Sequence, residues 1–215
     1  MSDYASQRQQ MVEQQLIPRG IGDPATLEAM REVPRHVFAP EELREYAYQD
    51  GPLPIGEGQT ISQPYIVALM TQAAEVESSD IVLEIGTGSG YGAAVLAHIA
   101  KEVYTIERFA SLMKQAVSCF QELGYTNIHA RVGDGSLGWP QEAPFDAILV
   151  TAGAPEPPPS LQQQLKVGGR LVIPVGDALG QELLCYRKIS EDQLSREWLE
   201  FVRFVPLVGQ EGWFY

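Results

Sequence analysis

The sequence is poor in cysteine, histidine and basic residues, and it contains no long hydrophobic run. Its two cysteines, Cys119 and Cys185, are too few for a disulfide framework and lack the spacing of a metal site. No apolar stretch approaches the roughly 18 residues that a membrane-spanning helix needs. The N-terminal residues are polar and lack the charged-then-apolar layout of a signal peptide. These absences favour a reducing compartment, and we therefore expect a cytoplasmic protein without a bound metal.

Acidic residues outnumber basic ones, since 28 Asp and Glu against 15 Lys and Arg give a formal net charge of −13. Surfaces that bind nucleic acid or anionic lipid normally carry an excess of Lys and Arg. We therefore expect neither a nucleic-acid partner nor a membrane partner. With 45% hydrophobic and 20% charged residues, the 215-residue chain has the composition of one globular domain with an extension.

Residues 1–75 are predicted to consist of helices and loops. Asp23 followed by Pro24 supplies an N-cap and a first-turn proline for one of these helices. The segment 49–64 is so dense in glycine and proline that it is predicted to be a loop, and loops of that length are usually functional or disordered. The predicted helices cover 7–16, 24–33 and 65–74.

From residue 80 onward, apolar strands alternate with helices, which implies a parallel sheet with right-handed crossovers. The alternating segments 182–189 and 198–205 predict an antiparallel hairpin at the sheet edge. The predicted fold class is α/β: a doubly wound, mostly parallel Rossmann-like sheet. Residues 1–75 would form its N-terminal helical cover and 76–215 its core, in one compact domain. The predicted strands are 81–85, 103–106, 128–132, 145–150 and 170–173, and the predicted helices are 91–100, 110–123 and 160–166.

The strongest local signal is the glycine-rich turn after the first of these strands, Gly86-Thr87-Gly88-Ser89-Gly90. Glycine lets the backbone approach a ligand closely, and the N-terminus of the following helix offers free amides. Dinucleotide-binding folds use G-x-G-x-x-G, but Tyr91 stands where the third glycine belongs. Glu84, just before the turn, suits a cationic ligand group better than a pyrophosphate. A tight turn needed only for packing is the alternative.

Further candidate ligands follow the next three strands. Glu107 can accept hydrogen bonds from both ribose hydroxyls of a nucleoside. Asp134, flanked by Gly133 and Gly135, can turn toward a base edge, although an ordinary Asp-Gly turn explains it equally well. Thr151-Ala152-Gly153 leaves room for a ligand. Because open α/β sheets bind ligands at the carboxyl ends of their strands, the joint arrangement predicts a nucleoside-type cofactor site.

The stretch Val82–Tyr91 resembles the first motif of the class I S-adenosylmethionine-dependent methyltransferases. More narrowly, nearly the whole chain, from about residue 11 to about residue 208, resembles the bacterial-type protein-L-isoaspartate (D-aspartate) O-methyltransferases. The heptapeptide Gly-Gln-Thr-Ile-Ser-Gln-Pro at 58–64 is the most specific of the matching motifs. The other matching segments are Val33–Phe38, Leu53–Gly56, Leu165–Leu171 and Val205–Leu207.

This resemblance implies a cytosolic repair enzyme. Such enzymes transfer a methyl group from S-adenosylmethionine to the α-carboxylate of L-isoaspartyl residues in damaged proteins, with D-aspartyl residues as a further candidate acceptor. The methyl ester closes to a succinimide, which can reopen to normal aspartate. The implied partners are isoaspartyl-containing proteins and peptides, and we expect a monomer that needs no metal.

The resemblance also implies roles for individual residues. Ser62 matches the active-site serine, and its local alternative is the N-cap of the following helix. Tyr65 and Val208 differ from the His and Thr that are common in animal-type members and are compatible with bacterial-type members. The residues expected to bind substrate are Ile61, Ser62, Tyr65 and Val208. The residues expected to bind the cofactor are Glu84, Gly86, Thr87, Gly88, Glu107, Asp134 and Gly135.

The residue types are consistent with a carboxylate acceptor. A carboxyl group with a pKa of ~4 is already ionised at neutral pH, so its methylation needs no general base, whereas an alcohol would need one. No histidine occurs in 49–64 or in the strand-end turns, and His36 is expected to be structural. The only charged residues of 49–64 are Asp50 and Glu57, which predicts that neutral hydrogen-bond donors hold the acceptor. The tail Trp213-Phe214-Tyr215 is expected to be a packed terminus, with an exposed contact patch as the alternative.

Three alternatives stay open. The first is a methyltransferase with another acceptor, which would not need the 58–64 heptapeptide. The second is an NAD-dependent oxidoreductase, against which Tyr91 at the third glycine position argues. The third is a non-enzymatic binding module that keeps the fold, against which the strand-end acids Glu107 and Asp134 argue.

Overall fold

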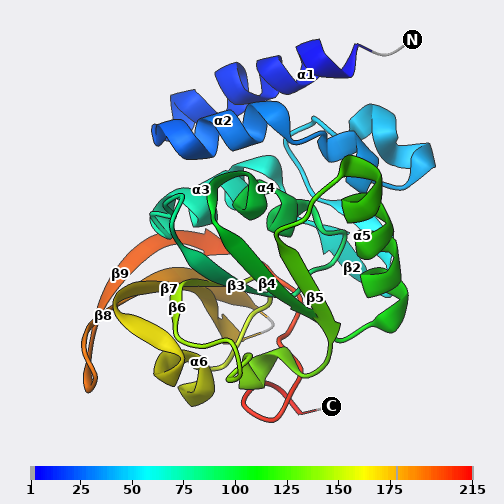
Figure 1. Cartoon of the computed structure of the whole chain (residues 1–215). Coiled ribbons are helices and arrows are strands. Elements are labelled where there is room, and N and C mark those ends of the chain that lie inside the picture. Colours follow the sequence, from blue (N-terminus) through cyan, green and yellow to red (C-terminus); the bar gives the residue numbers. More distant parts are fainter. Residues whose placement is uncertain (1–2, 178, 215) are drawn as a thin grey trace.

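A seven-stranded sheet with the order β5-β4-β3-β6-β7-β8-β9 forms the centre of the protein, in a computed structural model that describes residues 3–177 and 179–214 (Figure 1). The first five strands in this order pair in parallel, and β8 and β9 add antiparallel pairs at one edge. The predicted α/β class, the mostly parallel sheet and the C-terminal hairpin are therefore confirmed. The strands are β3 (Ile81–Ile85), β4 (Glu102–Glu107), β5 (Ile128–Val132), β6 (Phe145–Val150), β7 (Leu165–Asp177), β8 (Gly180–Ser190) and β9 (Gln193–Val202).

Helices cover both faces of the sheet. On one face lie α3 (Pro64–Ala73), α4 (Tyr91–Ile99) and α5 (Ala110–Leu123), and on the other lies the short α6 (Pro159–Gln163) (Figure 1). Successive side chains of a strand point to opposite faces. Accordingly, Val82 of β3 packs in the cluster under α3 to α5, whereas Leu83 packs in the cluster that includes Leu161 of α6. The strand is thus buried on both sides, as its continuous apolar sequence predicts.

The N-terminal segment forms an outer layer over α3 and α4 (Figure 1). Its helix α2 contacts both α3 and α4. Met11, Leu16 and Met30 are at most 1% exposed and belong to the same hydrophobic cluster as Val82 and Leu96, so this layer shares its core with the sheet. The elements of the layer are α1 (Tyr4–Met11), the π-helical turn η1 (Val12–Leu16), α2 (Pro24–Glu32), and the 3-10 turns η2 (Ile17–Arg19), η3 (Arg35–Phe38) and η4 (Glu41–Tyr46).

The prediction of an unbroken loop over 49–64 is wrong. The segment contains a small antiparallel hairpin of β1 (Leu53–Gly56) and β2 (Gln59–Ile61), which pair only with each other. Its turn consists of three residues with positive φ, Gly56, Glu57 and Gly58. Ile55 and Ile61 are buried, and their burial stabilises the hairpin against the rest of the protein.

Two predicted boundaries also differ from the structure. The helix predicted over 160–166 ends at Gln163, because Leu165 already pairs with Phe145 as the first residue of β7. The last strand, predicted over 198–205, is β9 and ends at Val202. The residues after Val202 leave the sheet, and several of them line the cavities described below.

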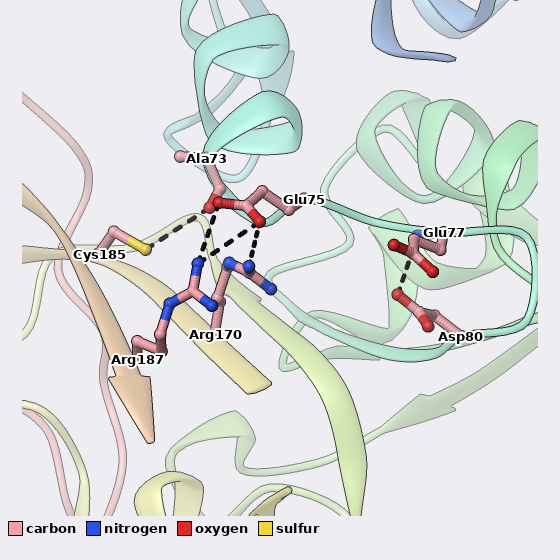
Figure 2. A network of polar contacts seen from close by, with 7 residues as sticks. All are labelled: Ala73, Glu75, Glu77, Asp80, Arg170, Cys185 and Arg187. Carbon is pink, nitrogen blue, oxygen red and sulfur yellow. Dashed lines mark hydrogen bonds and ion pairs between the residues drawn. The ribbon is translucent and has the colours of Figure 1, made fainter. Parts of the chain in front are cut away.

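A polar clamp fixes the C-terminal end of α3 on the sheet (Figure 2). Glu75, just after α3, forms ion pairs with Arg170 of β7 and, at 3.2 Å, with Arg187 of β8. The Cys185 thiol donates to the Ala73 carbonyl at 3.5 Å. The clamp thus ties the C-terminal end of α3, the helix that begins two residues after Ser62, to β7 and β8.

Candidate functional site

A cleft lies at the carboxyl ends of β3, β4, β5 and β6 and is covered by residues 59–62 and 205–208. This is the edge at which open α/β sheets bind ligands. Most of the residues that the sequence predicts for the site line this cleft. They are Ile61, Ser62, Glu84, Gly86, Thr87, Gly88, Glu107, Gly135 and Val208. Tyr65 and Asp134, which were also predicted, do not line it.

The glycine turn is held against two neighbouring strands. The backbone N–H groups of Gly86 and Thr87 donate to the Ile106 carbonyl of β4 at 2.9 and 3.3 Å. The Thr151 hydroxyl, after β6, donates to the Gly86 carbonyl at 2.7 Å. Gly86 has a φ of +95°, and a Cβ atom there would overlap the Thr151 hydroxyl. Only glycine therefore fits this position, and the turn is a rigid wall of the cleft.

Glu107 connects the end of β4 to the glycine turn. Its carboxylate accepts hydrogen bonds from the backbone N–H of Gly88 at 2.9 Å and of Phe109 at 3.0 Å. The side chain is 5% exposed and lines the cleft. A carboxylate oxygen can accept more than one hydrogen bond, so each oxygen can still serve a hydroxyl of a ligand.

Glu84 lies beneath the first turn of α4. Its carboxyl group accepts a hydrogen bond of 2.7 Å from the Thr105 hydroxyl, and Thr105 in turn contacts the Thr87 hydroxyl at 2.6 Å. The pKa of Glu84 is raised to about 8, mainly by burial and in part by the nearby charge of Glu107, while the hydrogen bond from Thr105 acts in the opposite direction. Without a ligand the group is therefore protonated at neutral pH.

Asp134 binds protein groups beside the cleft instead of lining it. Its carboxylate accepts hydrogen bonds from the Ser136 backbone at 2.9 Å and hydroxyl at 2.6 Å, and from the Gln210 backbone at 2.8 Å. Gly135 does line the cleft. The structure therefore gives Asp134 a clear part in holding the loop after β5 against the C-terminal tail.

Ser62 stands between the cleft and a second cavity of about 820 Å³, and it lines both. The N-cap residue of α3 is Gln63, and no side chain caps this helix, so the alternative interpretation of Ser62 as the N-cap is wrong. Its hydroxyl forms no hydrogen bond to any described residue and is available to a ligand.

Tyr65 is buried in α3 and lines neither cavity. The Arg19 guanidinium lies 3.5 Å from the centre of its ring and pairs with Asp50 at 3.1 Å. Gln63 also donates to Asp50, at 2.7 Å. Arg19 thus balances the negative charge of Asp50. The sequence of 49–64 contains no basic residue, so this ion pair could not be predicted from that segment alone.

The family model for protein-L-isoaspartate(D-aspartate) O-methyltransferase matches residues 6–212 of the chain. The chain belongs to this family. A protein-L-isoaspartate O-methyltransferase of Pelotomaculum thermopropionicum is 60% identical over 209 residues, which are 97% of this chain and 91% of that protein. Protein-L-isoaspartate O-methyltransferase 1 of Syntrophobacter fumaroxidans is 57% identical over 213 residues, 99% of each chain.

Solved structures of the family have the same fold. A protein-L-isoaspartate O-methyltransferase superposes with a TM-score of 0.85 and 30% identity, covering 95% of this chain and 67% of that one. The family member from Plasmodium falciparum, solved with S-adenosyl-L-homocysteine, superposes with a TM-score of 0.81 and 24% identity, covering 97% and 99%. Family membership favours a methyltransferase over the oxidoreductase and the non-enzymatic module.

Several residues that line the two cavities escaped prediction. Arg108 and Phe109 line the cleft directly after Glu107, and extending the strand-end rule by two residues would have found them. Arg203 and Asp177 line the larger cavity. Arg203 escaped prediction because the predicted last strand, 198–205, includes it, whereas β9 ends at Val202. Asp177 escaped prediction because the predicted strand 170–173 stops short of it, whereas β7 continues to Asp177.

The C-terminal tail packs on the site in part. The Trp213 indole donates to the Gly153 carbonyl at 3.0 Å and lines the larger cavity, as a packed terminus requires. Phe214 is 82% exposed, and Tyr215 lies outside the described residues. His36 lies in the N-terminal layer, 2.8 Å from the Tyr48 hydroxyl.

In residues 3–177 and 179–214, no group of His, Cys, Asp and Glu is placed to hold a metal ion. Within the same ranges, no helix has the length and hydrophobicity needed to cross a bilayer.

Proposed function

We propose that this protein transfers the methyl group of S-adenosylmethionine to the α-carboxylate of L-isoaspartyl residues in proteins and peptides. The position of Ser62 carries the proposal. This residue lines the cleft that contains the glycine turn and Glu107, and it also lines the larger cavity next to that cleft. A methyl donor in the cleft and a polypeptide in the cavity would meet at Ser62.

The cleft residues fit a nucleoside with a cationic amino-acid tail. When bound, S-adenosylmethionine supplies a methyl group on a positively charged sulfur. Glu107 would accept the ribose hydroxyls, and Gly135 would face the adenine. Glu84 would face the ammonium group, whose positive charge favours ionisation of this carboxyl group. Asp134 would act mainly by positioning Gly135, because its oxygens already accept three hydrogen bonds.

Binding requires the cleft to widen. Its volume of about 130 Å³ lies below the ~300–1,000 Å³ that is usual for small-molecule sites. Residues 59–62 and 205–208 form its cover, so we propose that these two segments separate when the cofactor enters and then close over it. Closure would exclude water from the reacting atoms, which strengthens the electrostatic interactions within the site.

The acceptor side needs positioning and no general base. An ionised carboxylate is itself the nucleophile, and among the described residues no histidine lines either cavity. The Ser62 hydroxyl would donate to one carboxylate oxygen and direct the other at the methyl group. Orientation of this kind supplies roughly 7–11 kcal/mol in well-aligned reactions. Ile61 and Val208, on the two covering segments, would hold the acceptor laterally.

We further propose a monomeric, cytoplasmic enzyme without nucleic-acid or membrane partners. The net charge of −13 supports the absence of polyanionic partners, and the free thiols of Cys119 and Cys185 support a reducing compartment. Within this enzyme, residues 1–75 would provide the substrate side through Ser62, and 76–215 would hold the cofactor. Sedimentation analysis at micromolar concentration checks the monomer.

A matched peptide pair tests the proposed function. The protein is incubated with methyl-labelled S-adenosylmethionine and with two peptides that differ only in having an isoaspartyl or an aspartyl residue at one position. Base-labile label in the isoaspartyl peptide alone is the expected result. Equal label in both peptides, or none in either, would contradict the proposal. A third peptide with a D-aspartyl residue shows whether that acceptor is also used.

A further inference from the structure

The larger cavity next to Ser62 exceeds what an isoaspartyl side chain requires. It measures about 820 Å³ and is lined mainly by apolar groups. One wall comes from the end of β9 and the residues after it, including Phe201 and Phe204, and the opposite side includes Ile66 of α3 and Trp213 of the tail. None of the groups assigned above to the transfer of the methyl group uses this apolar wall.

A pair of exposed aromatic side chains continues this wall onto the surface. Phe201 is 72% exposed and Trp198 is 49% exposed, and their rings meet edge to face with centroids 5.4 Å apart. In a regular strand, residues three positions apart point to opposite faces. Here Leu184 faces Trp198 and Leu183 faces Glu200, so an extra residue, Leu199, is accommodated in β9. This bulge re-aims the strand and brings the two rings together.

Hydrogen bonds of Gln181 hold the part of the apolar wall that follows β9. The Gln181 side chain accepts a hydrogen bond from the Phe204 backbone at 2.7 Å and donates to the Asp177 carbonyl at 2.7 Å. Gln181 is only 5% exposed, so these bonds are shielded from water. Within the described part of the chain, β9 pairs with β8 alone, which leaves its outer edge and the Trp198–Phe201 pair accessible.

We infer that the cavity and the Trp198–Phe201 pair form a subsite for an apolar, preferably aromatic, side chain next to the isoaspartyl residue of the substrate polypeptide. The inference rests on the proposed function. The cavity is continuous with the site of methyl transfer because Ser62 and Thr60 line both. Because Ser62 borders the cavity, a side chain that enters the cavity belongs to a residue close to the acceptor in the substrate sequence.

A polypeptide segment is the occupant that these observations favour. The acceptor is part of a polypeptide, so its flanking residues must lie next to Ser62 whenever the acceptor does. Aromatic side chains at the centre of an interface contribute most when a partner side chain covers them. The exposed pair of Trp198 and Phe201, which lies next to the cavity, is therefore suited to bind an apolar side chain of the substrate and so to favour polypeptides that contain one.

A peptide series with matched variants tests this subsite. Five isoaspartyl peptides are compared, one with alanine at all flanking positions and four with a single phenylalanine at −2, −1, +1 or +2. The quantity measured is the ratio of kcat/KM for each phenylalanine peptide to that for the alanine peptide. We expect a ratio of fivefold or more at one position in the native protein. Phe201→Ala and Trp198→Ala should each reduce this ratio to below twofold.

The control is Ile189→Ala, which removes an apolar side chain of similar exposure at the far end of β8. This variant should keep the native ratio. If all five peptides react at the same rate, or if the ratio survives both aromatic substitutions, the subsite is overturned while the proposed function stands. If the native protein methylates none of the five peptides, both the proposed function and the subsite fall.

Discussion

Glu107 and Gly88 are joined by a hydrogen bond of 2.9 Å from the glycine backbone to the carboxylate, which connects the loops after two neighbouring strands. The other carboxylate oxygen of Glu107 accepts a hydrogen bond from the backbone N–H of Phe109 at 3.0 Å. The residue assigned to the ribose hydroxyls is therefore also a brace of the glycine turn. Binding and the shape of the cleft depend on the same carboxylate.

Glu107→Gln should weaken cofactor binding strongly. The amide has the same shape, but its NH₂ group cannot accept a hydrogen bond from a backbone N–H. Hydrogen bonds to charged groups contribute about 1.5–3 kcal/mol, so the Kd for S-adenosylhomocysteine, measured by calorimetry, should rise roughly 10- to 100-fold. Glu102→Gln is the control, because Glu102 lies at the opposite end of β4 and contacts His129. Equal affinities in the two variants would show that Glu107 does not bind the ribose.

Ser62→Ala should reduce turnover and leave cofactor binding nearly unchanged. The variant removes one donor to an anionic acceptor, so kcat on an isoaspartyl peptide should fall roughly 10- to 100-fold, the equivalent of about 1.5–3 kcal/mol. Steady-state kinetics with a separate Kd measurement for S-adenosylhomocysteine checks both parts. Ser111→Ala is the control, since this exposed serine only contacts Glu57. Native turnover in Ser62→Ala would contradict the role of the hydroxyl.

The parallel part of the fold could be predicted because its strands are short apolar runs between clear helix signals. Residues 81–85 and 145–150 are strands in the structure with the predicted bounds. The β1–β2 hairpin could not be predicted in this way. Its strands are only four and three residues long, and their glycine and proline content hides the burial of Ile55 and Ile61. Its stability comes from contacts with distant parts of the chain, which local patterns do not report.

The cleft residues at the ends of the strands could be predicted from the sequence. The residues whose side chains contact distant parts of the protein could not. Glu107 and Gly135 line the cleft as the strand-end rule expects. Asp134 is predicted to bind the adenine, but in the structure its carboxylate accepts a hydrogen bond from the Gln210 backbone in the C-terminal tail. These two residues are 76 positions apart, so no local motif could predict their contact. The same holds for Tyr65, whose face is covered by Arg19.

Glu84 should make the stability of the ligand-free protein depend on pH. Its pKa in the folded protein is about 8, above the 4.5 of an exposed glutamic acid. Between these values the folded state keeps a proton that the unfolded state has lost, so the free energy of unfolding falls as pH rises, by up to about 1.4 kcal/mol per pH unit. Glu84→Gln cannot titrate and should lack this loss. Urea denaturation at pH 5, 6, 7 and 8 should therefore show Glu84→Gln gaining stability relative to the native protein as pH increases.

Glu156→Gln in the same pH series is the control for this titration. It removes an exposed carboxylate from the loop before α6 and should run parallel to the native protein from pH 6 to 8. If Glu84→Gln also runs parallel to the native protein over the whole range, the group titrates normally and the buried, protonated state described above is wrong.

Glu211 should stabilise the fold by tying the tail to α6. Its carboxylate accepts hydrogen bonds from the Ser160 backbone at 2.8 Å and hydroxyl at 2.7 Å, and its own backbone N–H donates to the Ser136 hydroxyl at 3.0 Å. Glu211→Ala leaves the Ser160 donors without this partner, so the free energy of unfolding from urea titration should fall by about 1–3 kcal/mol. Glu156→Ala, an exposed position in the loop before α6, should change it by less than about 0.5 kcal/mol. Because the same tail holds Asp134 through Gln210, the loss should also appear as weaker binding of S-adenosylhomocysteine in Glu211→Ala. Equal stability and affinity in the two variants would show that the contacts of Glu211 contribute neither to the stability of the fold nor to cofactor binding.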